Sequence, residues 1–228
     1  MSVEALVVLS GGQDSTTCLY WALNEFGAGR VASITFDYGQ RHRIEIECAR
    51  TVAKRAGVDN TVLPIDTFSA LGGASLTDDR IDIETSDAAE ALPNTFVPGR
   101  NLIFMTFAAA YAYQRDIDRL VTGVAQTDYS GYPDCRQDTI TALANAINLG
   151  MEGRFRIHTP LMNLSKAETV LLARDVGALP AMVDTHTCYQ GMRPPCGECQ
   201  ACTLRAKGFA EAGIADPLVE AAARGDLA

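Results

Sequence analysis

The chain has 228 residues, of which 47% are hydrophobic and 21% charged, and its net charge is −9. This length is enough to bury a full hydrophobic core, and we expect a single domain over residues 1–228. Nucleic-acid backbones are bound by basic surfaces, so the acidic balance argues against a nucleic-acid partner and favours a small molecule.

The apolar segments predict neither a leader peptide nor a membrane span. No basic stretch precedes the first apolar run at 5–9, and the longest apolar stretch, at 102–113, is interrupted by Thr106. A transmembrane helix needs about 20 apolar residues, so we interpret 102–113 as a buried helix. We therefore expect a cytoplasmic protein without a membrane partner, in which the seven cysteines stay reduced.

Short β-branched runs alternate with helical stretches along the chain. This alternation predicts an α/β fold in which helices flank a mainly parallel sheet. The strands that we expect, in chain order, are Ala5–Leu9, Val31–Phe36, Thr61–Ile65 and Leu120–Val124.

Two helices are predicted with their ends. Ile44, Cys48 and Val52 recur four residues apart and mark one apolar face of a helix, for which Gly57 is a C-terminal cap. The run Ser165-Lys166-Ala167-Glu168 has the spacing of a capping box and predicts a helix start.

The segment between Gly72 and Thr95 interrupts the alternation of strands and helices. It carries six acidic residues and one arginine, with few large apolar side chains. Such a composition buries little surface, so we expect a mobile loop. It is either a variable surface loop or a lid over a site, since long loops in compact domains are often functional.

The turn after the first strand reads Ser10-Gly11-Gly12-Gln13-Asp14-Ser15. A Gly-rich turn that opens a helix presents unpaired backbone N–H groups, and the helix dipole favours an anion there. The turn is not a Walker A loop, because no Lys-Ser or Lys-Thr pair follows the glycines. We therefore predict a phosphate site in which Asp14 holds a metal or caps its own loop.

Four cysteines lie within fifteen residues in the pattern C-x7-C-x2-C-x2-C: Cys188, Cys196, Cys199 and Cys202. Four thiolates suit tetrahedral Zn²⁺ and leave no open coordination position, so we expect a structural zinc site. A sulfur-carrying or redox pair of Cys199 and Cys202 and an iron–sulfur cluster are the alternatives. His186 either lies beside the metal ligands, faces substrate or is structural.

The Ser10–Ser15 turn resembles the SGGxDS pyrophosphate loop of the PP-loop ATP pyrophosphatases, whose fold is adenine nucleotide α-hydrolase-like. Two further motifs are Phe96-Val97-Pro98-Gly99-Arg100-Asn101 and the Asp-Tyr-Ser-Gly-Tyr-Pro-Asp-Cys-Arg run at 128–136. Together with the cysteines and their lead-in at 185–189, they make residues 9–209 similar to the 7-cyano-7-deazaguanine synthase family.

The resemblance implies an ATP-dependent C–N ligase of queuosine biosynthesis, in which 7-carboxy-7-deazaguanine and ammonia become 7-cyano-7-deazaguanine. The substrate carboxylate would be adenylated with release of pyrophosphate, and ammonia would then displace AMP to give an amide. A second ATP would convert the amide into the nitrile. The resemblance also implies Mg²⁺, one structural Zn²⁺ per chain in a subregion at about 186–210, and a homodimer.

The family pattern assigns roles residue by residue. The residues expected to bind ATP are Leu9, Ser10, Gly11, Gly12, Gln13, Asp14, Ser15, Thr16, Thr17, Cys18 and Leu19. The residues expected to act in catalysis are Asp14, Ser15, Arg100 and Lys166. The residues expected to bind the substrate are Arg100, Asp128, Tyr132, Asp134 and Arg136.

Several of these roles have alternatives. Arg100 could bind phosphate or the substrate carboxylate, or form a surface ion pair. The 127–136 segment could read the base or be a self-bonded turn, and Cys135 could be buried filler or a reactive thiol. The strand end at 35–38 is where this superfamily holds adenine. The rival functions are tRNA modification by sulfur relay and a non-enzymatic regulator with a degenerate site.

Overall fold

The computed structural model describes residues 2–78, 80–83, 92–127 and 132–227. Its centre is a five-stranded sheet in the order β3-β2-β1-β4-β5, and every neighbouring pair is parallel. The strands are β1 Ala5–Val8, β2 Val31–Asp37, β3 Asn60–Pro64, β4 Arg119–Val121 and β5 Arg156–His158. The predicted α/β class with a parallel sheet is confirmed, and β5 is a strand that the sequence patterns did not identify.

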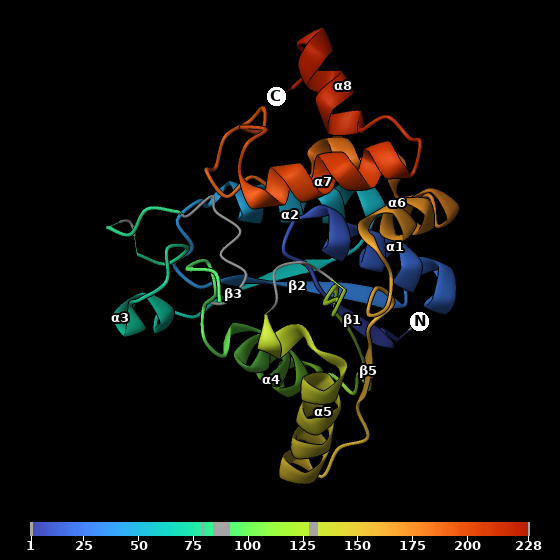
Figure 1. Ribbon diagram of the computed structural model, residues 1–228. Helices are drawn as coiled ribbons and strands as arrows, with labels where there is room; N and C mark the ends of the chain where they lie inside the picture. The colour runs from blue at the N-terminus through green and yellow to red at the C-terminus, as the bar shows by residue number, and fades with distance from the viewer. Residues whose placement is uncertain (1, 79, 84–91, 128–131, 228) are drawn as a thin grey trace.

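Helices cover both faces of this sheet (Figure 1). Helices α4 and α5 lie on one face, whereas α1 and α2 lie on the other face, with α6, α7 and α8 stacked beyond them. The helices are α1 Gln13–Phe26, α2 Ile44–Ala56, α3 Phe68–Leu71, α4 Arg100–Tyr113, α5 Gln137–Met151, α6 Lys166–Asp175, α7 Gln200–Glu211 and α8 Pro217–Arg224, with 3-10 turns η1 Pro133–Cys135 and η2 Leu179–Asp184.

The central strand β1 is apolar along its whole length because both of its faces are buried. Leu6 packs into the core beneath α4, whereas Ala5, Val7 and Leu9 pack against α1 and α2. Parallel strands covered by helices on both sides read as continuous apolar runs rather than as alternating ones. This burial explains why the first five-residue apolar run is a strand and not the start of a helix.

The two predicted helix ends are confirmed. Gly57 follows α2 in the left-handed conformation, with φ of 68°, and its N–H bonds to the carbonyls of Ala53 and Lys54. Ser165 and Glu168 form the reciprocal capping box at the start of α6. The apolar stretch predicted as a buried helix is α4, but only one face of it is buried, at Met105, Ala108, Ala109 and Ala112. Phe107 and Tyr113 are exposed on its other face, so the expectation of a fully buried helix is corrected.

The fold places its switch point at the end of β1. The chain passes from β1 through α1 to β2 on one side, whereas β4 pairs with β1 on the other side. Ligands of open α/β sheets bind outside the carboxyl ends of the strands at such a point. The Ser10–Ser15 loop follows β1 directly and therefore lies where this rule expects a ligand.

The described part of the 72–95 segment differs from the mobile, solvated loop that we expected. Ala74 and Ser75 are fully buried, and the Ser75 N–H donates to the Asn94 carbonyl at 2.9 Å. The Arg41 N–H donates to the Leu76 carbonyl at 2.9 Å, and Leu76 lines the cavity described below. The reason is that small residues, which carry little apolar area, can still pack closely when their backbone groups are paired.

Within the described residues, no helix is both long enough and apolar enough to span a lipid bilayer.

Candidate functional site

The loop between β1 and α1 is held in shape by its own hydroxyl groups. The Ser10 and Ser15 hydroxyls are 3.0 Å apart, and the Ser15 hydroxyl also donates to the Gly12 carbonyl at 3.1 Å. Gly12 is the N-cap of α1 and offers no side chain to the first helical N–H groups. These donors therefore stay available to an anion at the positive end of the helix dipole.

The main chain of Gly11 lies directly against α2. Its φ is +88°, and a Cβ there would lie 2.3 Å from the Glu45 carbonyl oxygen and 2.8 Å from the Ala49 nitrogen. Only glycine adopts this conformation without strain and leaves room for the helix behind it. The first glycine of the motif is thus required by packing, and it fixes the position of the loop relative to α2.

Asp14 and Lys166 form an ion pair across the loop, with 2.7 Å between Oδ2 and Nζ. Their side chains are 27% and 17% exposed, respectively. Lys166 opens α6, and a Cβ on Gly208 of α7 would lie 2.9 Å from the Lys166 Cβ, so close helix packing sets where the lysine stands. The geometry brings together two of the four predicted catalytic residues, which are 152 positions apart in the sequence.

A cavity of about 280 Å³ opens beside this loop at the carboxyl edge of the sheet. Ser10, Gly12 and Lys166 line it. Thr35 and Phe36 of β2 line it as well, at the strand end predicted to lie near adenine. The volume is close to the lower end of small-molecule sites, and the wall combines apolar side chains with a few charged groups.

Arg100, the first residue of α4, also lines this cavity. Its guanidinium donates to the Tyr38 hydroxyl at 3.4 Å and lies 5.9 Å from the centre of the Tyr38 ring. The side chain therefore contacts an aromatic neighbour, and within the described residues it forms no surface ion pair. Burial raises the pKa of Tyr38 above its ordinary value, although the nearby Arg100 charge opposes that shift.

Glu45 is a lining residue that sequence reasoning missed. Burial raises the pKa of its carboxyl from 4.5 to about 7, while the positive charge of Arg100 opposes this shift. No motif in the sequence marks Glu45. The one available signal was its place on α2, immediately after the strand end that was expected to hold adenine.

The predicted substrate residues near 128–136 separate in space. Tyr132 lines the cavity, and its hydroxyl lies 2.6 Å from the Thr95 hydroxyl. The Asp134 carboxylate is buried and accepts the Asn101 N–H at 3.1 Å, so it caps α4 and does not line the cavity.

Arg136 is exposed at the start of α5, and Asp128 lies outside the described residues. Cys135 lines the cavity and receives a hydrogen bond from the Asn101 amide.

The far end of the predicted ATP-binding run is buried in the core. Cys18 and Leu19 are fully buried between α1 and the sheet, and Thr16 and Thr17 are also buried. Among the described residues that line the cavity, this run is represented by Leu9, Ser10, Gly12, Gln13, Asp14 and Ser15. The helix carries its next turn into the interior, so contact with a ligand ends after the first helical turn.

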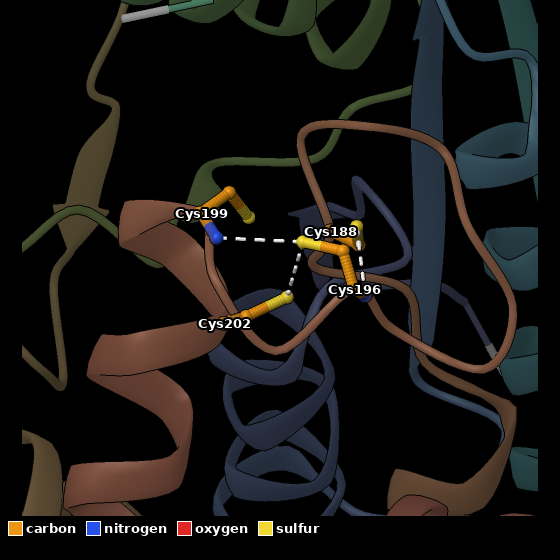
Figure 2. A group of neighbouring side chains, drawn as sticks. All are labelled: Cys188, Cys196, Cys199 and Cys202. Atoms are coloured by element: carbon orange, nitrogen blue, oxygen red, sulfur yellow. Dashed lines mark hydrogen bonds between the residues drawn. The ribbon is translucent and has the colours of Figure 1, made fainter. Parts of the chain in front are cut away.

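The four cysteines converge at one place (Figure 2). Their sulfur atoms all lie within 4.8 Å of one another, and the Cys196 and Cys202 sulfurs are 3.8 Å apart. Tetrahedral Zn–S bonds of about 2.3 Å require sulfur atoms roughly 3.8 Å apart, so the set fits one metal ion. Hydrogen bonding from Cys202 lowers the pKa of Cys199, which favours the thiolate form that metals bind.

The cysteine segment is bonded to the Ser10–Ser15 loop. The His186 N–H donates to the Gly11 carbonyl at 2.9 Å, and the His186 Nε2–H donates to the Cys188 carbonyl at 2.8 Å. Arg205 of α7 supports the same lead-in, because its guanidinium donates to the Thr185 hydroxyl at 2.7 Å and pairs with buried Asp216 at 2.6 Å. The cysteine cluster and the anion-binding loop are therefore parts of one wall.

Comparison with known proteins indicates the same family as the sequence motifs do. A family model described as "Queuosine biosynthesis protein QueC" matches residues 4–213. The chain is 68% identical over 218 residues to the 7-cyano-7-deazaguanine synthase of Chromobacterium violaceum, with 95% of this chain and 93% of that protein covered. It is 67% identical over 217 residues to the 7-cyano-7-deazaguanine synthase of Laribacter hongkongensis, with 95% and 94% covered.

The fold is also similar to that of a solved structure described as a 4-thiouridine synthetase–RNA complex with bound ATP. The TM-score is 0.51 at 14% sequence identity, and the match covers 92% of this chain and 50% of that chain. This likeness concerns the fold alone. Because the family model spans most of the chain, we conclude that the protein belongs to the QueC family of queuosine biosynthesis proteins.

Proposed function

We propose that this chain is an ATP-dependent ligase that converts 7-carboxy-7-deazaguanine and ammonia into 7-cyano-7-deazaguanine. The observation that carries the proposal is the Ser10–Ser15 loop, with its free helix N-terminus, opening onto a cavity at the switch point of the sheet. Relatives 67% and 68% identical over nearly the whole chain are named for this activity.

The main task of the protein in adenylation is to stabilise the charge of the departing pyrophosphate. The N–H groups at the start of α1 and the Ser10 and Ser15 hydroxyls supply preorganised donors for it. Lys166 lies at hydrogen-bond distance from Asp14 and adds a positive charge at the same edge. The guanidinium of Arg100, which contacts Tyr38, can form a bidentate hydrogen bond with a phosphate or with the substrate carboxylate.

The acyl adenylate forms when the substrate carboxylate attacks the α-phosphate of ATP and pyrophosphate leaves. Ammonia then attacks the carbonyl carbon, and AMP leaves with the electrons of the broken C–O bond, which gives the amide. In the second round the amide oxygen attacks another ATP, and loss of AMP leaves the nitrile. Both rounds use the same leaving group, so one anion-binding loop serves both.

Two metals belong to the proposal. Asp14 is the residue that would hold Mg²⁺ beside the phosphates, since a single carboxylate with phosphate oxygens is a common Mg²⁺ environment. When bound, Mg²⁺ would neutralise developing phosphate charge. Cys188, Cys196, Cys199 and Cys202 would hold one structural Zn²⁺, which the sulfur spacing fits.

We further propose one domain over residues 1–228, a cytoplasmic location, a homodimer and no nucleic-acid partner. Light scattering of the purified chain tests the dimer, and filter retention with labelled tRNA tests the last point. Equimolar zinc without retained tRNA would support the proposal, whereas tight retention would favour a tRNA-modifying enzyme.

The decisive experiment is mass spectrometry of the products formed from 7-carboxy-7-deazaguanine, ATP and ammonium chloride. We expect the nitrile, together with two AMP and two pyrophosphate for each molecule formed. Accumulation of the amide alone would restrict the function to the first round. No acid-dependent release of AMP and pyrophosphate would contradict the proposal.

A further inference from the structure

The proposed reaction needs a proton acceptor that the residues assigned so far do not provide. The nitrogen of ammonia loses one proton when it becomes the amide nitrogen, and the amide nitrogen loses two more on the way to the nitrile. These protons leave the reacting nitrogen inside the cavity, so the acceptor should be a side chain that lines it. The inference below rests on the proposed function.

Few described residues of the cavity wall could act as this base. The carboxylates among them are Asp14 and Glu45, and His186 is the histidine. Asp14 is engaged by Lys166 at 2.7 Å and by the Gln13 amide at 3.4 Å. His186 is 3% exposed, and its ring is held by the Cys188 carbonyl. Glu45 therefore remains as the candidate.

The position of Glu45 is fixed by the packing of α2 against the loop. Glu45 is the second residue of α2, and its carbonyl oxygen is the atom that a Cβ on Gly11 would meet at 2.3 Å. Its side chain lines the same cavity as Ser10, Lys166 and Arg100. Within the described residues, no hydrogen bond or ion pair engages its carboxylate, so both oxygens are available to a ligand.

The electrostatic surroundings of Glu45 suit proton transfer near neutral pH. Arg100 from α4 is the charged group that acts on Glu45. The Glu45 charge in turn raises the pKa of Tyr38, which follows β2, and of Cys48 on its own helix. Burial raises the pKa of Glu45 to about 7, and Arg100 acts in the opposite direction. A general base works best when its pKa is close to the working pH.

We propose that Glu45 is the general base that takes a proton from the attacking ammonia nitrogen. The nitrogen lone pair forms the C–N bond to the carbonyl carbon of the acyl adenylate, and the Glu45 carboxylate accepts one proton from that nitrogen. The C–O bond to AMP breaks, and its electron pair stays on the AMP oxygen. In the second round Glu45 takes protons from the amide nitrogen, and solvent accepts them between the steps.

The test separates the two half-reactions with Glu45→Gln, which keeps the shape of the side chain. Exchange of pyrophosphate into ATP, dependent on 7-carboxy-7-deazaguanine and measured without ammonium, reports adenylation alone. Amide and nitrile formation, divided by the concentration of free ammonia, reports the nitrogen step. We expect exchange within about threefold of the parent and product formation about 100-fold slower, which is the usual effect of losing a general base.

The pH profile gives a second signature. In the parent chain the rate per free ammonia should rise through about pH 7, where Glu45 ionises, and then level off. Glu45→Gln should lose this rise, and Glu45→Asp should keep it at a lower rate. The control is Glu47→Gln on the same helix, because Glu47 is 68% exposed and pairs with Arg50 on the surface. This control should leave both half-reactions unchanged.

Three outcomes would overturn the inference. If Glu45→Gln loses exchange as strongly as product formation, Glu45 serves ATP or substrate binding instead. If only the KM for 7-carboxy-7-deazaguanine rises, Glu45 binds the deazaguanine ring of the substrate and does not take its proton. If rate and pH profile are both unchanged, Glu45 has no role in the reaction. Failure of the proposed function itself looks different, because the parent chain would then show no acid-dependent exchange.

Discussion

The Ser10–Ser15 loop and the Cys188–Cys202 segment stand side by side, but different forces hold them. The loop follows a fully buried strand and is clamped between α2 and the sheet, so the core of the protein sets its shape. The cysteine segment packs into a small cluster made of its own four cysteines, Ala201 and Tyr189. The loop is therefore held in shape by the fold, whereas the cysteine segment packs mainly around its own thiols.

His186, two residues before the cysteine segment, links the two regions, because its N–H donates to the Gly11 carbonyl. Through this contact, a change in the cysteine segment can reach the loop. Substitutions can test whether the fold holds the loop and a bound metal holds the segment.

Asp14→Asn should separate chemistry from stability within the loop. Turnover is expected to fall by about 10³-fold, because the variant loses the charge that pairs with Lys166 and would hold Mg²⁺. Stability should change by less than about 1 kcal/mol, since the pair is partly exposed. Steady-state kinetics and urea unfolding check both numbers. Normal turnover would remove Asp14 from the site.

Gly11→Ala should damage the framework of the loop. The new Cβ would lie 2.3 Å from the Glu45 carbonyl oxygen at a φ of +88°, so we expect a loss of about 3 kcal/mol. The matched control is Gly12→Ala, whose nearest contact would be 3.4 Å from the His186 carbonyl. Equal urea midpoints for the two variants would show that α2 does not clamp the loop.

Cys199→Ser should act on the metal and then on stability. Removing one of four ligands is expected to weaken zinc binding by at least roughly 100-fold. At saturating zinc, a 100-fold loss of affinity corresponds to a loss of about 2.7 kcal/mol in stability. Zinc content by atomic absorption and thermal melting with and without a chelator check the result. A stable, zinc-loaded but inactive variant would indicate a catalytic thiol instead.

Glu45 should give the smallest effect, a pH dependence of stability. Its pKa in the folded chain is about 7, above the ordinary 4.5, so folding favours the protonated form. The contribution of Glu45 to the free energy of unfolding is therefore fully present below pH 4.5, and it is lost as the pH rises through 7. The shift sets a ceiling of about 3 kcal/mol, and because Glu45 is partly exposed and solvent screens its charge we expect about 1 kcal/mol, which Glu45→Gln should remove. Urea unfolding at pH 5 and pH 8 checks it, and identical slopes for both proteins would contradict it.

Much of the fold could be predicted from local patterns. Four of the five strands and both helix ends at Gly57 and Ser165 were found, because apolar runs and capping residues act over a few neighbours. The short strand β5 and helices α3, α5, α7 and α8 were not predicted. Arg156–His158 is too polar to read as a strand, and it is one only because β4 lies beside it.

The candidate site, like the fold, could be predicted from the sequence only in part. The phosphate loop and the cysteines were visible because each motif is contiguous or nearly so in sequence. Asp134 was expected to read the base, but it caps α4, since its neighbour in space is the Asn101 N–H. Lys166 and Asp14 were each singled out, yet their 2.7 Å contact joins residues 152 positions apart.

The motifs of this protein could be predicted from the amino-acid sequence alone. They are a glycine-rich turn after an apolar strand, four cysteines at metal-binding spacing and the motifs that resemble a known family. Only the tertiary structure decided which groups face one cavity, because Arg100, Glu45 and Lys166 come from three helices that the sheet order brings to a single edge. Local patterns follow from forces between near neighbours, whereas the charge environment of Glu45 follows from burial among distant segments.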